Sequence, residues 1–161
     1  VQSARHLITA LPRAVAVVRS ANSVLAQKLA AEGLTIVECP EAAEGMGRTI
    51  AAGVAASAGA AGWVVALADM PFLAPGTIAQ VAERIRAGDA LAAPRYRGER
   101  GHPVGFAARW REMLVASRGD EGARALLKAQ RDNIRAVEVE DPGVLRDIDT
   151  LADLDPPPLK P

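Results

Sequence analysis

Three short, largely apolar runs constrain the fold of this chain more than any other feature of the sequence. They are AVAVV at residues 14–18, LTIVE at residues 34–38 and WVVALA at residues 63–68. Runs of this length and composition are typical of strands that are buried on both faces of a sheet. Because segments with helical character separate them, they predict an α/β fold whose mostly parallel sheet carries helices on both faces.

The remainder of the chain continues this alternation, with one interruption. We expect further elements in these places: helices at residues 20–33, 48–57, 77–87, 109–116 and 121–130, and strands at residues 89–93 and 134–139. Residues 94–106, PRYRGERGHPVGF, interrupt the pattern and predict a β-hairpin insertion. We expect Tyr96 on its first arm, Gly98 in its turn, and Val104 and Phe106 on its second arm.

Length and charge limit the classes of protein to which the chain can belong. Its 161 residues fit a single domain over residues 1–155, followed by a proline-rich tail at residues 156–161. Lys and Arg total 19, as do Asp and Glu, and this zero net charge argues against a protein that coats nucleic acid. The single cysteine, Cys39, forms no internal disulfide and indicates a reducing compartment. With no signal peptide and no apolar run of membrane-spanning length, we expect a cytoplasmic protein that has no membrane partner.

Asp69 directly follows the third apolar run, in the stretch VVALADMPFL. Ligands of open parallel sheets bind beyond the carboxyl ends of the strands, so a carboxylate at this place faces the binding crevice. There it can hold Mg²⁺, which usually takes one or two carboxylates together with substrate phosphates. It can equally cap the turn before Pro71 through hydrogen bonds to the backbone. The spacing alone favours neither interpretation.

Three other motifs lie at predicted helix starts. GMGRT at residues 45–49 opens a helix with glycines, whose exposed backbone amides favour an anionic ligand. DIDT at residues 147–150 offers two carboxylates, and GDEGAR at residues 119–124 is a second glycine-bracketed start. Each has a structural alternative: a tight turn for the first, and a helix cap for the others.

Four side chains that can carry positive charge are concentrated on the predicted hairpin: Arg95, Arg97, Arg100 and His102. A solvated, charged sheet edge explains such a run without any ligand. A phosphorylated substrate that binds beside Asp69 explains it as well, since guanidinium groups match phosphate geometry.

Taken in order, five motifs resemble the MobA-like nucleotidyltransferase family, and within it the molybdenum cofactor cytidylyltransferase branch. They are EGMGRTIAAGV, LADMPFL, PRYRGERGHPVGF, GDEGAR and DIDTLADL. The resemblance implies a Rossmann-like, doubly wound fold. It also implies Mg²⁺-dependent transfer of a nucleotide monophosphate from an NTP to a phosphate on molybdopterin, with release of pyrophosphate. It favours CTP over GTP.

The resemblance also assigns roles to individual residues. It implies that Asp69 is the catalytic carboxylate and Mg²⁺ ligand, and that Asp149 of DIDT is a second carboxylate near the metal. The nucleotide pocket is implied to consist of Gly45, Met46, Gly47 and Thr49. The acceptor side of the cleft is implied to consist of Arg100, Gly101, His102 and Pro103.

Two departures from the family keep other functions open. Arg48 stands where relatives commonly carry a small hydroxyl residue, and the first strand with its glycine-rich loop, LAAGxSxRMGxxK, is absent. Because the loss of a central strand would leave two unpaired edges, we expect a longer natural protein. The alternatives are a non-catalytic relative that binds a nucleotide or a pterin, and an accessory partner of a molybdenum hydroxylase. An NAD-linked oxidoreductase is disfavoured, because no GxGxxG follows a strand.

Overall fold

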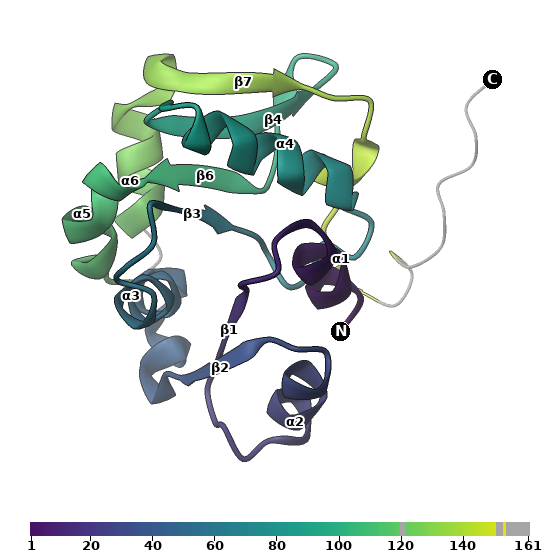
Figure 1. Ribbon diagram of the computed structural model, residues 1–161, viewed down its shortest axis with the longest axis vertical. Helices are drawn as coiled ribbons and strands as arrows, with labels where there is room; N and C mark the ends of the chain where they lie inside the picture. Colours follow the sequence, from purple (N-terminus) through teal and green to yellow (C-terminus); the bar gives the residue numbers. More distant parts are fainter. Residues whose placement is uncertain (120–121, 151–152, 154–161) are drawn as a thin grey trace.

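The computed structural model describes residues 1–119, 122–150 and 153, and it contains two sheets (Figure 1). The smaller sheet pairs β1 (Val15–Val18) with β2 (Thr35–Glu38) in parallel. The strands of the larger sheet are β3 (Gly62–Val65), β4 (Leu91–Tyr96), β5 (Glu99–Arg100), β6 (Val104–Ala107) and β7 (Ile134–Glu138). In the larger sheet β6 lies between β3 and β4, and β7 pairs with β4.

Strand directions confirm the expected α/β class and add two reversed strands. β6 is antiparallel to both of its neighbours, β3 and β4, and β5 is antiparallel to β4, whereas β7 is parallel to β4. β3, β4 and β7 therefore run in one direction, and β5 and β6 run against them. The purely parallel part of the structure is thus small.

Helices cover both faces of the larger sheet, as predicted. The helices are α1 (Gln2–Ala10), α2 (Val24–Ala31), α3 (Met46–Ala56), α4 (Pro75–Arg86), α5 (Arg111–Val115) and α6 (Gly122–Ala129). Ala92 packs with Val81 of α4, whereas Leu91 and Ala93 pack with the apolar side chains of α3, α5 and α6. This division follows from the two-residue period of a strand, which sends successive side chains to opposite faces. Within the described ranges, no helix has the length and apolarity needed to cross a membrane.

No ladder joins the two sheets within the described part of the chain. In the described residues no backbone hydrogen bond joins β1 to β3. The amide of Thr35 donates to Ala14 and that of Cys39 to Val18, so Val15 and Val17 direct their backbone groups away from β2. Packing joins the sheets instead. On one side Gly53 of α3 lies against Val17, and on the other Leu7 of α1 packs on the apolar clusters beside both sheets.

The third strand is shorter than the sequence predicts, because its partner is interrupted. We expected a strand over residues 63–68, but β3 ends at Val65, so the prediction is wrong for its last three residues. Val65 pairs with Val104, the first residue of β6. Pro103, which precedes it, has no N–H to donate to a ladder and follows a cis peptide bond. Beyond Val65 the chain is therefore free to turn toward Asp69.

The predicted hairpin has a two-residue turn. It joins β4 to β5 through Arg97 and Gly98, whose φ angles of 49° and 86° suit a two-residue turn. Tyr96 and Gly98 occupy the expected places. The expectation that Val104 and Phe106 form the second arm is confirmed, because they lie on β6, which is antiparallel to the start of β4 and also pairs with β3.

A distant carboxylate caps the start of α4. The Asp141 carboxylate accepts hydrogen bonds from the Ala74 amide (2.9 Å), the Thr77 hydroxyl (2.7 Å) and the Gly143 amide (2.9 Å). Asp141→Ala should lower the free energy of unfolding by about 1–3 kcal/mol, because three donors lose their acceptor. Urea denaturation measures this loss. Thr77→Val, which removes a single bond, serves as the milder comparison, and an Asp141→Ala variant as stable as the parent contradicts the capping role.

Candidate functional site

Asp69 lies in an exposed turn that both of its flanks hold in place. The Ala68 carbonyl accepts a hydrogen bond from the Ser3 hydroxyl at 2.7 Å, and Met70 is only 2% exposed. The Asp69 carbonyl accepts from the Ile148 amide at 2.9 Å, which brings the DIDT motif beside the turn. The Asp69 side chain is therefore exposed on a backbone that is held on both sides.

His102 lies close to this turn. Its amide donates to the Val144 carbonyl at 2.9 Å, and the peptide bond to Pro103 is cis. Gly101 is buried, and a Cβ there would lie 2.2 Å from the Val144 carbonyl oxygen, so only glycine fits this approach. Within the part of the chain that the structure describes, the buried Nδ1 of His102 has no hydrogen-bond partner. The segment from Gly101 to Pro103 is thus held in one conformation, with an imidazole nitrogen left for another group.

Three charged side chains act on the His102 ring. Burial lowers the pKa of the imidazole below its ordinary value, and Arg100 lowers it further. Asp69 and Asp147 oppose this shift and raise the pKa. The structure therefore brings Asp69 and Asp147, which are distant in the sequence, close enough to His102 for their charges to act on it, together with its near neighbour Arg100.

The lowered pKa of His102 predicts a pH-dependent stability. Between the folded-state pKa and the ordinary value of 6.5, the unfolded chain binds more protons than the folded protein. The contribution of His102 to stability is therefore fully present above 6.5 and is lost as the pH falls toward the folded-state pKa. His102→Gln should flatten the dependence of the unfolding free energy between about pH 7.5 and about pH 5. Denaturation curves at several pH values measure the slope, and a slope equal to that of the parent contradicts the assignment.

The predicted nucleotide pocket lies at the start of α3, against the segment that follows α5. The Gly47 amide donates to the Gly119 carbonyl at 2.7 Å, and a Cβ on Gly47 would lie 2.6 Å from that oxygen. Gly45 has a φ of 121°, which favours glycine. Met46 is 46% exposed, and Thr49 is half-buried. The amide of Gly47 is thus engaged within the protein, and what the glycine provides is room for close backbone contact.

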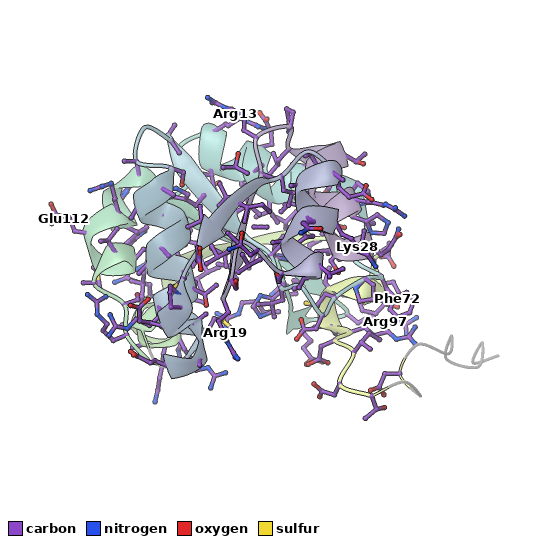
Figure 2. All side chains as sticks on the ribbon, turned by 90° about the horizontal axis from the view of Figure 1, so that it is seen from below. Arg13, Arg19, Lys28, Phe72, Arg97 and Glu112 are labelled. Carbon is purple, nitrogen blue, oxygen red and sulfur yellow. The ribbon has the colours of Figure 1, made fainter. Side chains whose placement is uncertain are left out.

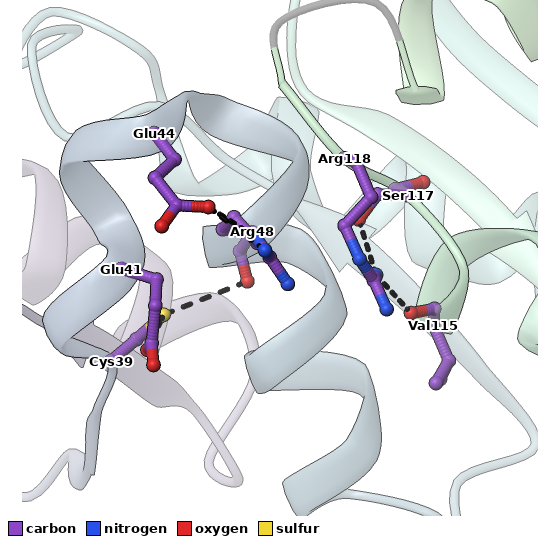
Figure 3. Close-up of polar contacts among 7 residues, drawn as sticks. All are labelled: Cys39, Glu41, Glu44, Arg48, Val115, Ser117 and Arg118. Atoms are coloured by element: carbon purple, nitrogen blue, oxygen red, sulfur yellow. Dashed lines mark hydrogen bonds and ion pairs between the residues drawn. The ribbon is translucent and has the colours of Figure 1, made fainter.

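Arg48, which departs from the family pattern, turns toward its own helix start. Its guanidinium pairs with Glu44 at 2.8 Å. Figure 3 shows this pair beside Arg118, whose guanidinium donates to the carbonyls of Val115 (3.0 Å) and Ser117 (2.7 Å). The Arg48 side chain is thus engaged by Glu44, which lies in the short 3₁₀ helix η1 (Pro40–Glu44).

The DIDT motif separates into a capping part and a part near the site. The Asp153 carboxylate accepts from the Asp149 amide (3.2 Å) and from the Thr150 amide and hydroxyl (2.7 and 2.8 Å), and these bonds lower its pKa. The capping carboxylate is thus Asp153, while those of Asp147 and Asp149 are exposed. Asp147, for which no separate role is predicted from the sequence, is the one whose charge acts on His102. Residues 151–152 and 154 of this motif, and residues 120–121 of GDEGAR, lie outside the described residues.

The site suits a hard cation that is completed by substrate. Among the described residues, no group of three or more His, Cys, Asp or Glu side chains has the arrangement of a self-contained metal site. Mg²⁺ is typically bound through one or two carboxylates plus phosphates, and Asp69 with the nearby Asp147 provides carboxylate oxygens of that kind. The residues present thus fit a metal that binds together with a nucleotide.

Comparisons with known proteins identify the family of the chain. Residues 2–134 match the MobA-like NTP transferase domain. Purine catabolism protein PucB of Bacillus subtilis (strain 168) is 35% identical over 120 residues, which cover 73% of this chain and 58% of PucB. The chain therefore spans less than two thirds of the length of that relative.

Two solved structures share the fold. Rv0371c of Mycobacterium tuberculosis H37Rv, in its complex with manganese, superposes with a TM-score of 0.70 at 24% identity, over 94% of this chain and 83% of that chain. A nucleotidyl transferase from Methanothermobacter thermautotroptrophicus (Mth528) gives a TM-score of 0.75 at 20% identity, over 94% and 74% of the respective chains. These likenesses confirm the Rossmann-like α/β fold that the sequence predicts. Because the family match extends over most of its length, the chain belongs to the MobA-like NTP transferase domain family.

Proposed function

We propose that this protein transfers a nucleotide monophosphate, CMP in preference to GMP, from an NTP to a phosphate on a molybdopterin-type acceptor. The observation that carries the proposal is the convergence of Asp69, His102 and Asp147, from three separate segments, around one turn at the rim of the sheet. Two of the three are exposed carboxylates, which can hold a divalent cation that offsets the negative charge of two anionic substrates.

In this reaction an oxygen of the acceptor phosphate attacks the α-phosphorus of the NTP, a P–O bond forms, and the bond to pyrophosphate breaks. Asp69, with Asp147 or Asp149, would hold Mg²⁺, which offsets the negative charge that the two substrates bring together. Gly45, Met46, Gly47 and Thr49 contact the nucleotide, and the segment from Gly101 to Pro103 shapes the acceptor side. No protein nucleophile is needed, so positioning and electrostatics supply the catalysis.

We also propose that residues 1–155 form one domain that a further strand completes between β1 and β3. The outward-facing backbone groups of β1 support this, because a buried strand edge without partners is costly. A glycine-rich loop after that strand would contact the triphosphate. Hydrogen exchange tests the proposal: the Val17 amide should be protected in the natural full-length protein, and fast exchange there argues against a completing strand.

A pyrophosphate-release assay with molybdopterin as acceptor tests the function. We expect turnover with CTP to exceed turnover with GTP, and release to require both the acceptor and Mg²⁺. A protein that binds CTP and molybdopterin but releases no pyrophosphate is not a transferase.

A second candidate is a binding or accessory protein that presents the cofactor to a molybdenum hydroxylase. The hydrogen bond from the Gly47 amide to the Gly119 carbonyl favours this second candidate, because the amide already has an acceptor without a nucleotide. The relative PucB, a purine catabolism protein, sets a metabolic context for such a role. Calorimetry with CTP and GTP, followed by capture experiments with a molybdenum hydroxylase, separates the two candidates.

A further inference from the structure

A hollow of about 220 Å³ lies on the face of the larger sheet formed by β4, β5 and β7. Its floor is aliphatic, from Ala93, Ile134 and Ala136. Ala93 lies on the face of the larger sheet that packs against α3 and α6. α6 ends at Ala129, and the short 3₁₀ helix η3 (Arg131–Asn133) leads directly into β7, so no helix of the described residues covers this end of the face.

Three arginines surround the hollow: Arg95, Arg100 and Arg131. They come from β4, from β5 and from η3, so strand pairing and the chain turn before β7 bring them together. An aliphatic floor with several guanidinium groups at its rim matches a small organic anion whose charged end meets the arginines.

The charges at the rim are only partly balanced. Arg95 donates from Nε to the Glu138 carboxylate at 2.7 Å. Arg131 and Asp132 are 3.4 Å apart, but their side chains are 77% and 87% exposed, so water weakens the pair. Arg100 forms no hydrogen bond or ion pair within the described part of the chain. At least one guanidinium thus has its donors available for an incoming anion.

Arg100 connects the hollow to the candidate site. It lies two residues before His102, and the charges of Arg100 and of Asp69 act on the same imidazole. Gly101, between Arg100 and His102 in the sequence, is held in two ways. Its amide donates a hydrogen bond to the Pro94 carbonyl at 2.9 Å, and its backbone lies close to Val144. An anion in the hollow therefore lies next to the segment that the proposed function places on the acceptor side.

We propose that Arg95, Arg100 and Arg131 form the subsite that binds the phosphate monoester of the acceptor. The inference rests on the proposed function and adds Arg131 and Arg95 to the acceptor side of the site. Planar guanidinium groups bind phosphate oxygens through paired N–H donors, which a single ammonium cannot reproduce. The apolar floor would contact the organic part of the ligand.

Calorimetry on the natural full-length protein tests the subsite, with phenyl phosphate as the acceptor probe and Mg²⁺ with CTP as the nucleotide probe. Arg100→Gln and Arg131→Gln should each weaken phenyl phosphate binding by about 10-fold, since each removes a charge-assisted contact. Both variants should bind CTP as the parent does, because none of the residues predicted for the nucleotide pocket lines the hollow.

Arg97→Gln is the matched control. Arg97 is in the turn of the same hairpin, but it stacks over the Tyr96 ring at 5.2 Å and is not part of the hollow. Figure 2 shows its side chain at the outer rim of the molecule. Its loss should leave the affinity for both probes within about 2-fold of the parent, because an exposed charge that does not line the hollow is screened by water and contributes little.

The outcomes separate the subsite from the transfer reaction. If Arg100→Gln and Arg131→Gln weaken CTP binding and spare phenyl phosphate, the arginines serve the nucleotide, and the acceptor subsite is refuted. Equal affinities in all variants, or no binding of phenyl phosphate by the parent, mean that the arginines only protect a sheet edge. Selective loss of phenyl phosphate binding supports the subsite even if no pyrophosphate is ever released, in which case only the transfer function fails.

Discussion

Asp69→Asn should lower the rate of nucleotide transfer by at least about 100-fold. The variant loses the negative carboxylate that holds the metal ion, and the metal ion is what offsets the negative charge of the phosphates. The fold should be retained. Asparagine keeps the backbone carbonyl that accepts from Ile148, and the side chain is exposed, so no buried contact is removed. Pyrophosphate release gives the rate, and thermal unfolding verifies the fold.

Asp132→Asn provides the control for this experiment. Asp132 is an exposed carboxylate beside Arg131, 87% accessible, and removing its charge should change the rate by less than about 2-fold. If Asp69→Asn turns over at the parental rate, Asp69 is not the metal ligand, and the bond of its carbonyl to Ile148 is its main role.

Gly101→Ala should lower the free energy of unfolding by about 2–4 kcal/mol. The added methyl group would clash with backbone atoms, which cannot move aside as a flexible side chain can. A Cβ at this position would lie 2.2 Å from the Val144 carbonyl oxygen and 2.7 Å from the carbon. Relief would require the hairpin and the segment around Val144 to separate. Since the His102 amide bonds to the same carbonyl, transfer activity should fall with stability.

Gly76→Ala is the matched comparison for this substitution. Gly76 lies in α4, and a Cβ there would have no atom within 4 Å. Alanine is the better helix former, so stability should stay equal or rise by up to about 1 kcal/mol. Urea denaturation of both variants decides the point. Similar losses in the two would show that the close approach of Gly101 to Val144 is not important.

The sequence predicted the place of Asp69 but not its surroundings. An apolar run that ends in a carboxylate and a proline is a local signal, and it correctly indicated a strand followed by a turn at the rim of the sheet. Where the strand ends depends on its partner, and the break in that partner at Pro103 lies almost 40 residues away, which a periodicity argument does not include.

Contacts between distant segments account for the other omissions. Asp141 caps α4 through Ala74, which lies 67 residues earlier, and Arg131 lines the same hollow as Arg100 only because β7 pairs with β4 in one particular register. Neither has a local motif. Asp147 was within reach of sequence reasoning, since DIDT was recognised, but choosing between its two carboxylates requires knowing that Ile148 bonds to Asp69.

Titration with Mn²⁺ in the presence of CTP, followed by electron paramagnetic resonance, tests the central claim most directly. The claim is that the Asp69 carboxylate holds a divalent ion together with the nucleotide. The parent should bind Mn²⁺ with an affinity that CTP increases. In the presence of CTP, the affinity of Asp69→Asn for Mn²⁺ should be lower than that of the parent by about 10-fold or more, the loss expected for one charged ligand. Equal CTP-dependent binding of Mn²⁺ by the parent and by Asp69→Asn would contradict the account.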